Sequence, residues 1–272
     1  GTLPGFTDAD AIDANFDGSV VVGTNSFNGA GTKQAYRWTP SGGMQGLGLD
    51  TIAYGVSGDG NVVIGEFGSA PQGFVWTQAS GRQNLIGLPG GTGATLARGI
   101  NFDGSIIVGR SGPSTNLPTM WINGVPVEMA GNMTSGLFTP NGVSDDGAVA
   151  VGVVQEISGL FAGIWTSTTG VVRLSDYLSM NGVTIPAGVR LYNCTGISAD
   201  GRTFAGWTEG SLGIQGYVAT IPTPCPADLD NDGSLSNGGT RDRAVTIDDL
   251  LCLLAAFESG NLAADLDNGS NT

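Results

Sequence analysis

Five short stretches of the chain share one pattern of apolar and polar positions. In each, a short apolar run leads to an Asp-Gly pair, and a second apolar run follows and ends at a glycine. Asp and Gly tolerate the positive φ of a tight turn, so the pattern is typical of two antiparallel strands joined by a hairpin. The stretches are AIDANFDGSVVVG (11–23), YGVSGDGNVVIG (54–65), RGINFDGSIIVG (98–109), NGVSDDGAVAVG (141–152) and TGISADGRTFAG (195–206).

The hairpins recur with a period, because their aspartates lie 42, 44, 43 and 54 residues apart (Asp17, Asp59, Asp103, Asp146 and Asp200). The first four are each followed by a run with one tryptophan (Trp38, Trp76, Trp121 and Trp165), a Gly turn and a fourth run. Four short strands per repeat is the size of a propeller blade, which must pack on its neighbours to bury its faces. We predict an all-β, five-repeat β-propeller of four-stranded antiparallel blades over residues 1–221. A flat or solenoidal stack of the same hairpins is the competing architecture.

The repeats resemble those of the HAF-type extracellular proteins, whose signature is a GVSxDGxVVVG hairpin, an AFRWT-like strand and LGxLPG. The last element stands here as LIGLPGG (85–91) and, truncated, as GTLPGF (1–6). LSDYLSMNGV (174–183) is similar to that family's short helix, and GYVATIP (216–222) to its closing strand. The resemblance implies an exported protein and no particular reaction.

The fifth repeat ends after its third strand, at residues 217–221. Thr2-Leu3-Pro4 is the segment that can complete it, and we expect closure within the chain. The alternative is strand donation between chains, because an unpaired sheet edge recruits strands.

The repeated polar and aromatic residues have structural interpretations that we prefer. We expect the five hairpin aspartates to cap their own turns rather than form a ring of catalytic or metal-binding carboxylates. The tryptophans are expected in the core between blades rather than on a sugar-stacking surface. Cys194 is expected to be a buried apolar residue or half of a disulfide.

Composition excludes several classes of function. The chain has 272 residues, 47 of them Gly, 12% charged residues, a net charge of −14 and no histidine. Such a polyanion is poorly suited to nucleic acid or anionic membranes, and no apolar run is long enough for membrane insertion. The missing imidazole excludes histidine-based triads and zinc sites. An N-terminus without Met or a signal region indicates a mature secreted chain, extracellular or at the cell surface.

Catalysis is not predicted. Glycosidases built on five-bladed propellers use acidic residues that converge on the central channel. Ten acids of residues 1–221 lie outside the Asp-Gly pairs, and no recognisable catalytic motif surrounds any of them. We therefore predict no enzyme and no catalytic residue.

The C-terminal segment, residues 227–272, predicts a calcium site. After the Pro-rich linker 222–226, the sequence ADLDNDGS (227–234) supplies loop positions 1, 3, 5 and 7 of a calcium loop. Position 12 should hold an acid but is glycine; if residues 235–244 are an insertion, that acid is displaced to Asp249, at the start of an amphipathic run. The predicted metal ligands are Asp228, Asp230, Asp232, Ser234 and Asp249.

This segment resembles a dockerin type I module with a truncated second repeat, which begins at AADLDNGS (263–270). The resemblance implies docking on a cohesin-like partner. Cys225 and Cys252 could bridge each other, Cys194 or another chain. We therefore expect a secreted structural or adhesive protein that attaches to a surface or assembles with copies of itself into filaments. The alternative is a carbohydrate-binding or glycan-processing propeller anchored by a dockerin.

Overall fold

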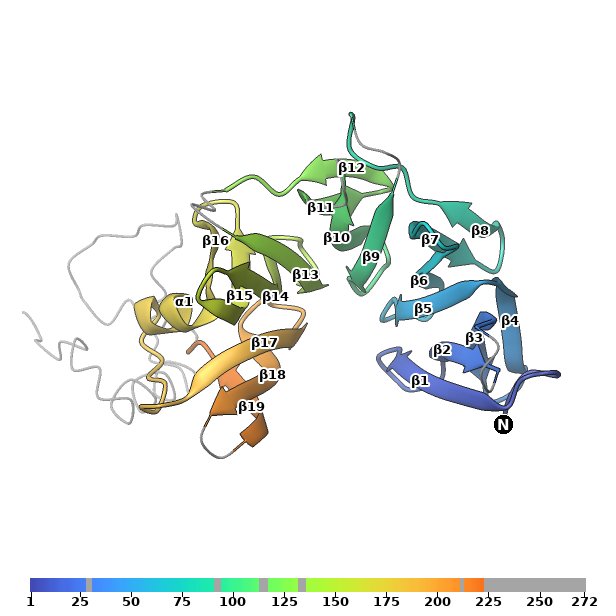
Figure 1. Cartoon of the computed structure of the whole chain (residues 1–272), viewed down its shortest axis with the longest axis horizontal. Helices are drawn as coiled ribbons and strands as arrows, with labels where there is room; N and C mark the ends of the chain where they lie inside the picture. The colour runs from blue at the N-terminus through green and yellow to red at the C-terminus, as the bar shows by residue number, and fades with distance from the viewer. Residues whose placement is uncertain (28–30, 91–93, 113–116, 132–135, 211–212, 223–272) are drawn as a thin grey trace, which may run out of the picture. The chain divides into compact units, whose positions relative to one another are not determined.

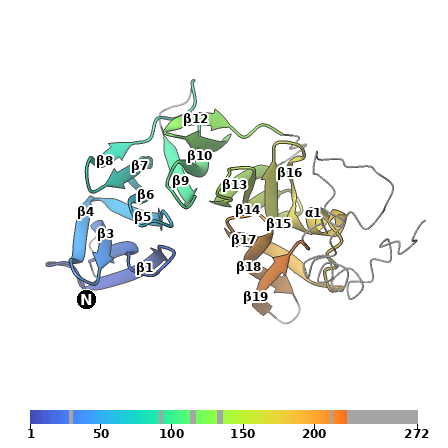
Figure 2. The same cartoon turned by 180° about the vertical axis from the view of Figure 1, so that it is seen from behind.

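The computed structural model of the chain describes residues 1–27, 31–90, 94–112, 117–131, 136–210 and 213–222. The chain divides into two units, residues 1–221 and 222–272. The described secondary structure lies in the first unit and consists almost entirely of antiparallel strands (Figures 1 and 2). No helix among the described residues is long and apolar enough to cross a membrane.

Five sheets follow one another in chain order. The first contains β1 (Asp8–Ala14), β2 (Val21–Ser26), β3 (Lys33–Thr39) and β4 (Gly43–Leu49). The second contains β5 (Thr51–Val56), β6 (Val62–Phe67), β7 (Gln72–Thr77) and β8 (Gly81–Asn84). The third contains β9 (Thr95–Ile100), β10 (Ile106–Ser111), β11 (Leu117–Ile122) and β12 (Val125–Glu128).

One helix lies between the fourth and fifth sheets along the chain. The fourth contains β13 (Leu137–Val143), β14 (Val149–Glu156), β15 (Gly159–Thr166) and β16 (Gly170–Arg173). Helix α1 (Leu174–Met180) follows at the predicted place. The fifth contains β17 (Arg190–Ile197), β18 (Thr203–Gly210) and β19 (Gly213–Thr220). The predicted four-stranded antiparallel repeat is thus confirmed for four sheets, whereas the described residues of the fifth form three strands.

The core lies between consecutive sheets. Among the described residues, four hydrophobic clusters occupy the four junctions from the first sheet to the fifth. For example, Val63 of β6 packs with Val22 of β2, and Phe204 of β18 packs with Ile164 of β15. None of these clusters joins the first sheet to the fifth. Each sheet therefore buries its faces against its neighbours in sequence, as repeat units of this size require.

The glycine that ends each hairpin run has a steric reason. The pairing of the first two strands of every sheet contains a bulge or irregularity near this glycine. A Cβ built on Gly109 would lie 1.8 Å from the main-chain oxygen of Leu96 on the first strand. The equivalent glycines meet a main-chain oxygen at 1.9 to 2.0 Å (Gly23, Gly65, Gly152 and Gly206). No side chain fits at these positions.

The predicted closure of the fifth repeat by Thr2-Leu3-Pro4 is wrong for the described residues. The main-chain N–H of Leu3 donates to Asn25 Oδ1 of β2 at 3.0 Å, so this segment lies on the first sheet. The third strand of the fifth sheet, β19, pairs with β18 alone.

Candidate functional site

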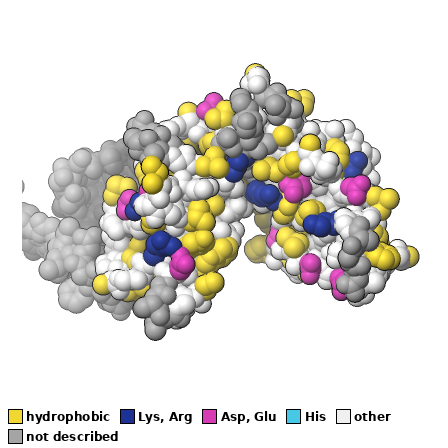
Figure 3. All heavy atoms as spheres, viewed as in Figure 1, with side chains coloured by type: hydrophobic (Ala, Val, Ile, Leu, Met, Phe, Trp, Pro, Cys, Tyr) yellow, Lys and Arg dark blue, Asp and Glu magenta, His cyan; other side chains and the backbone are white. Residues whose placement is uncertain are grey.

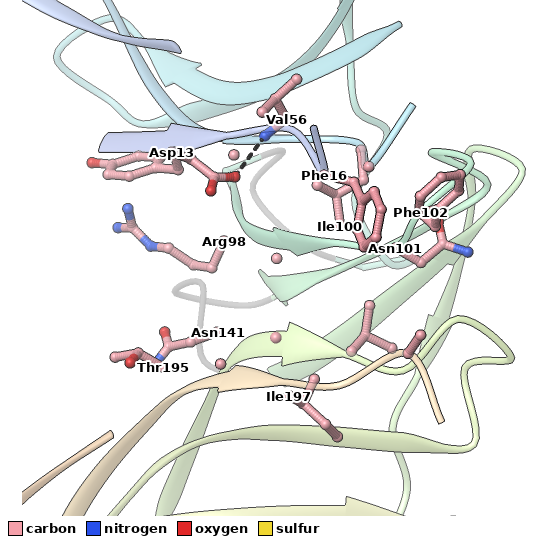
Figure 4. Close-up of a pocket in the computed structure, with 18 of the residues that line it drawn as sticks. Asp13, Phe16, Val56, Arg98, Ile100, Asn101, Phe102, Asn141, Thr195 and Ile197 are labelled. Atoms are coloured by element: carbon pink, nitrogen blue, oxygen red, sulfur yellow. Dashed lines mark hydrogen bonds between the residues drawn. The ribbon is translucent and has the colours of Figure 1, made fainter. Parts of the chain in front are cut away.

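The first strands of all five sheets line one cavity of about 780 Å³ (Figure 4). This volume lies within the range of small-molecule sites. Four polar side chains lie towards one side of it, and the aromatic side chains lie towards the other, together with Asn101. The polar set is Asp13, Arg98, Asn141 and Thr195, and the apolar set is Phe16, Ile100, Phe102 and Ile197.

Asp13 ties the first sheet to the second at the polar side. Its Oδ2 accepts a hydrogen bond from the main-chain N–H of Val56 at 2.9 Å, and its Oδ1 accepts one from Ala14 at 2.9 Å. Burial raises the pKa of Asp13, and these two hydrogen bonds oppose the shift. The carboxylate therefore serves as a structural acceptor between β1 and β5.

Arg98 of β9 belongs to a second polar group. Its guanidinium lies 3.9 Å from the centroid of the Tyr54 ring, and its Nη2 lies 3.6 Å from Glu66 Oε2. Tyr54 Oη donates to Glu66 Oε1 at 2.6 Å. Burial is the main cause that raises the pKa of Tyr54, and this hydrogen bond raises it further. Three charged or polar side chains from β5, β6 and β9 thus partner one another beside the cavity.

The apolar side of the cavity is aromatic and open to solvent. The rings of Phe16 and Phe102 meet edge to face with centroids 5.9 Å apart. Phe16 is 85% exposed and Phe102 44% exposed. Gly58 belongs to the hairpin turn of the second sheet, and Phe16 and Phe102 belong to the turns of the first and third sheets. A Cβ on Gly58 would lie 2.2 Å from the Phe102 ring. The two rings form an exposed aromatic pair from the first and third sheets.

The hairpin turns are linked from sheet to sheet. The main-chain N–H of Phe16 donates to Gly58 O at 3.1 Å, and that of Asp59 donates to Phe102 O at 3.0 Å. Asp145 Oδ1 accepts from the Phe102 N–H at 3.0 Å, and the Asp145 N–H donates to Ala199 O at 3.0 Å. The turns therefore form a continuous hydrogen-bonded series from the first sheet to the fifth.

The interpretation of the hairpin aspartates as turn caps is confirmed. In every turn the carboxylate accepts from the main-chain N–H two residues later, at 2.9 to 3.1 Å. The following glycine always has a positive φ, between 71° and 77°. Each aspartate is thus engaged within its own turn. Among the described residues, no group of three or more His, Cys, Asp or Glu side chains could hold a metal ion.

These turn bonds predict an acid-sensitive fold. Hydrogen bonds from serine side chains and main-chain N–H groups lower the pKa of Asp17, Asp103, Asp146 and Asp200. At Asp59 burial is the largest single influence and raises the pKa, but bonds from Ser57 and Asn61 together outweigh it. A carboxyl with a lowered folded-state pKa stabilises the fold above its unfolded value, and loses that contribution as the pH falls through its folded value.

We therefore expect stability to fall on acidification below about pH 4. In Asp103→Asn the amide keeps an acceptor for the turn but does not titrate, so its free energy of unfolding should depend less steeply on pH in that range. Urea unfolding of both proteins at several pH values measures the difference. Identical pH profiles for the two proteins would contradict the role of the carboxylate.

The tryptophans lie mainly in the core. Trp76 and Trp121 are buried, which confirms the core interpretation for them, and Trp165 is partly buried against the third-to-fourth junction. Trp121 Nε1 donates to Ile86 O at 2.7 Å, and Trp165 Nε1 donates to Ala130 O at 2.9 Å. Trp38 is half-buried. The indoles of Trp121 and Trp165 thus each bond to the connecting segment that comes before their own sheet in the chain.

Cys194 is a buried free cysteine, as one of the two sequence interpretations expects. Burial raises the pKa of its thiol to about 11, so the thiolate that nucleophilic chemistry needs is scarce at neutral pH. Its Sγ contacts the main-chain oxygens of Gly196 and Ala205, each at 3.4 Å. It packs as a core residue of the fifth sheet.

The predicted metal ligands are Asp228, Asp230, Asp232, Ser234 and Asp249, and they lie outside the described residues, as do Cys225 and Cys252. The calcium site therefore stays a prediction. Sequence reasoning missed the cavity groups of the first unit. Asp13, Tyr54, Arg98 and Asn141 occupy first strands, but their residue types differ from repeat to repeat, so the periodic pattern did not single them out.

Comparison with known proteins supports the fold. No protein-family model and no curated protein sequence matches the chain. Among solved structures, a putative TolB from Agrobacterium tumefaciens is 14% identical over 79% of this chain and 77% of its own, with a TM-score of 0.52. The beta-propeller domain of the Trilobed protease from Pyrococcus furiosus is 11% identical over 79% of this chain and 69% of its own, with a TM-score of 0.47.

Its antiparallel sheets and its likeness to the putative TolB structure show that the first unit is an all-β protein of the β-propeller class. TolB from Acinetobacter baumannii is a third similar structure, 18% identical over 61% of this chain and 43% of its own, with a TM-score of 0.43. At these identities the likeness concerns the fold alone.

Proposed function

We propose that the chain is a secreted, non-catalytic structural or adhesive protein. In this proposal residues 1–221 form a five-bladed propeller of the HAF type that serves as a scaffold. Residues 227–272 form a dockerin-like module that binds calcium and attaches the propeller to a cell surface, to a cohesin-like partner or to other copies of the chain. Extracellular filaments are the assembled form.

The engagement of the cavity carboxylates supports a role without catalysis. Asp13 and Asp145 are the acids that line the cavity, and each accepts a main-chain hydrogen bond from the neighbouring sheet. Glu66 is held by Tyr54 and Arg98. A glycosidase needs one carboxyl free to protonate the leaving group and a second one to attack or to activate water. These groups instead join sheets, which suits a scaffold.

The distribution of charge along the chain supports calcium binding by the second unit. The face seen in Figure 3 carries few charged side chains among many hydrophobic and uncharged ones. Of the 24 acidic residues of the chain, nine lie in residues 225–272. This concentration of carboxylates in a short segment favours a cation as the ligand of the second unit.

Glycan binding is a second candidate, and the two-sided cavity favours it. Sugar rings present apolar C–H faces that pack on aromatic rings, and hydroxyl groups that bond to carboxylates, amides and guanidinium groups. Phe16 and Phe102 supply exposed rings, and Arg98 supplies a guanidinium group on the opposite side. Asn141 adds an amide there, whose Nδ2 also donates to Asn193 Oδ1 at 3.1 Å. The cavity therefore offers the chemistry that a sugar unit needs.

A glycan array combined with a hydrolase screen distinguishes the two candidates. For the scaffold we expect neither tight sugar binding nor turnover, and no change in either readout for Phe16→Ala. Binding that Phe16→Ala weakens about tenfold would establish the glycan candidate instead, since one ring contact is worth on the order of 1 kcal/mol. Turnover of any glycan would overturn the non-catalytic proposal.

A further inference from the structure

In the part of the chain that the structure describes, the outer edge of the fifth sheet has no fourth strand. In the first four sheets the third strand pairs with a fourth strand on its far side. Among the described residues, β19 is the third and last strand of its sheet. Two of its apolar side chains are largely exposed, Ile214 at 78% and Val218 at 73%. An edge of this kind is an open template for strand pairing.

The fourth sheet shows what such an edge accepts. Gly152 of β14 pairs with Gly163, and its repeat equivalent Gly206 pairs with Tyr217, so Ile164 corresponds to Val218. Ile164 pairs with Val172 of β16, and its side chain is buried against the fifth sheet. The matching position on β19 therefore suits an antiparallel strand that brings an aliphatic side chain opposite Val218.

The unpaired main-chain groups of β19 belong to its even-numbered residues. The N–H of Ile221 donates to Arg202 O, and the register between β18 and β19 runs without interruption. Hydrogen-bonding direction alternates along a strand, so the odd-numbered residues bond to β18 and the even-numbered ones face the open edge. The edge-facing residues are Ile214, Gly216, Val218 and Thr220.

This series is self-complementary about Gly216. If two copies of β19 align antiparallel with Gly216 opposite Gly216, Ile214 of each copy lies opposite Val218 of the other. Ile214, Gly216 and Val218 of each copy then direct their main-chain N–H and C=O groups toward the other copy, as antiparallel strand pairing requires. The eight residues of β19 include no charge and no proline, the two features that usually protect an exposed edge.

We propose that β19 is a homodimerisation strand, which pairs with β19 of a second copy in this register and joins two fifth sheets into one continuous sheet. Each chain carries a net charge of −14, so two copies approach most easily through an uncharged segment. The nearby Glu209 is held by Arg190, which offsets its charge. The inference rests on the proposed assembly function and names the partner as a second copy of the chain.

A charge-swap series in the full chain tests the register. Ile214→Lys and Val218→Glu each place a charge opposite an aliphatic side chain, and we expect each to weaken the dimer about tenfold or more. In the double variant the lysine at 214 of each copy lies opposite the glutamate at 218 of the other copy. The double variant should therefore dimerise more tightly than either single variant. Ile157→Lys is the matched control, because Ile157 is 98% exposed in the turn between β14 and β15, and its dimer should equal the wild type.

Sedimentation velocity over a range of concentrations, with calcium and with a chelator, gives the dimer affinities. Dimers of the wild type and the double variant with the chelator, where calcium-dependent assembly is switched off, and dissociation of the single variants in the same condition, establish the pairing. A wild-type chain that stays monomeric overturns it, as does a dimer that Ile214→Lys leaves intact or a double variant weaker than both single ones. Calcium-dependent surface attachment by monomeric Ile214→Lys separates this inference from the proposed function, because in that assay the proposed function fails when the wild type itself does not attach.

Discussion

Replacing both Asp228 and Asp232 by Ala should abolish calcium binding by the chain. The two carboxylates supply positions 1 and 5 of the predicted loop, and affinity in such loops depends on the number of charged ligands. We expect the affinity to fall by about 100-fold or more, and calcium-dependent attachment to be lost with it. Isothermal titration calorimetry of the full chain measures the change directly.

Asp242→Ala is the matched control for this pair. Asp242 lies in the segment 235–244 that we interpret as an insertion, so its replacement removes one carboxylate from the same region without removing a predicted ligand. Its calcium affinity should stay close to the wild-type value. Equal losses in Asp242→Ala and in the double variant would mean that calcium binds through diffuse charge, and would contradict the proposed loop.

The replacement of Gly109 by Ala should cost about 3 kcal/mol of folding stability. Its Cβ would lie 1.8 Å from Leu96 O, a main-chain atom of β9 that cannot rotate away. The two strands would have to separate, which would disturb the junction where Ile107 and Ala97 pack together. The cost therefore arises from a backbone collision, and no change of rotamer relieves it.

Urea unfolding of Gly109→Ala beside Gly196→Ala provides the measurement and its control. Gly196 also lies in a first strand, β17, but a Cβ there would meet its nearest neighbour, Ala205 Cβ, at 3.8 Å, an ordinary contact. We expect Gly196→Ala to change stability by less than about 1 kcal/mol. If Gly109→Ala were equally mild, the steric explanation of the repeated glycine would be wrong.

The hairpins could be predicted because their determinants are local. An Asp-Gly pair with a capping carboxylate and a positive φ specifies a turn within four residues, and all five turns have this geometry. The size of the repeat then follows from counting apolar runs, and the short helix at 174–180 from its resemblance. The repeated glycine was visible as a pattern, but its cause, a carbonyl of the first strand, needed the pairing register.

The relations between distant residues could not be predicted in this way. The closure by Thr2-Leu3-Pro4 failed because the side-chain Oδ1 of Asn25 accepts the main-chain N–H of Leu3 on the first sheet, which a count of strands does not reveal. The cavity groups were missed because Asp13, Tyr54 and Arg98 come from three repeats that share no residue type at these positions. Such side chains meet only once the sheets are packed.

Electron microscopy of the purified full chain with calcium is the most direct test of an assembling, non-catalytic scaffold. The edge pairing alone forms closed dimers, because a two-fold contact uses the same surface on both copies. A second contact through residues 227–272 extends these dimers. We expect filaments in which neighbouring copies join at their fifth sheets, and dimers when calcium is chelated. Uniform single particles in both conditions would contradict the proposal that this protein functions by assembling.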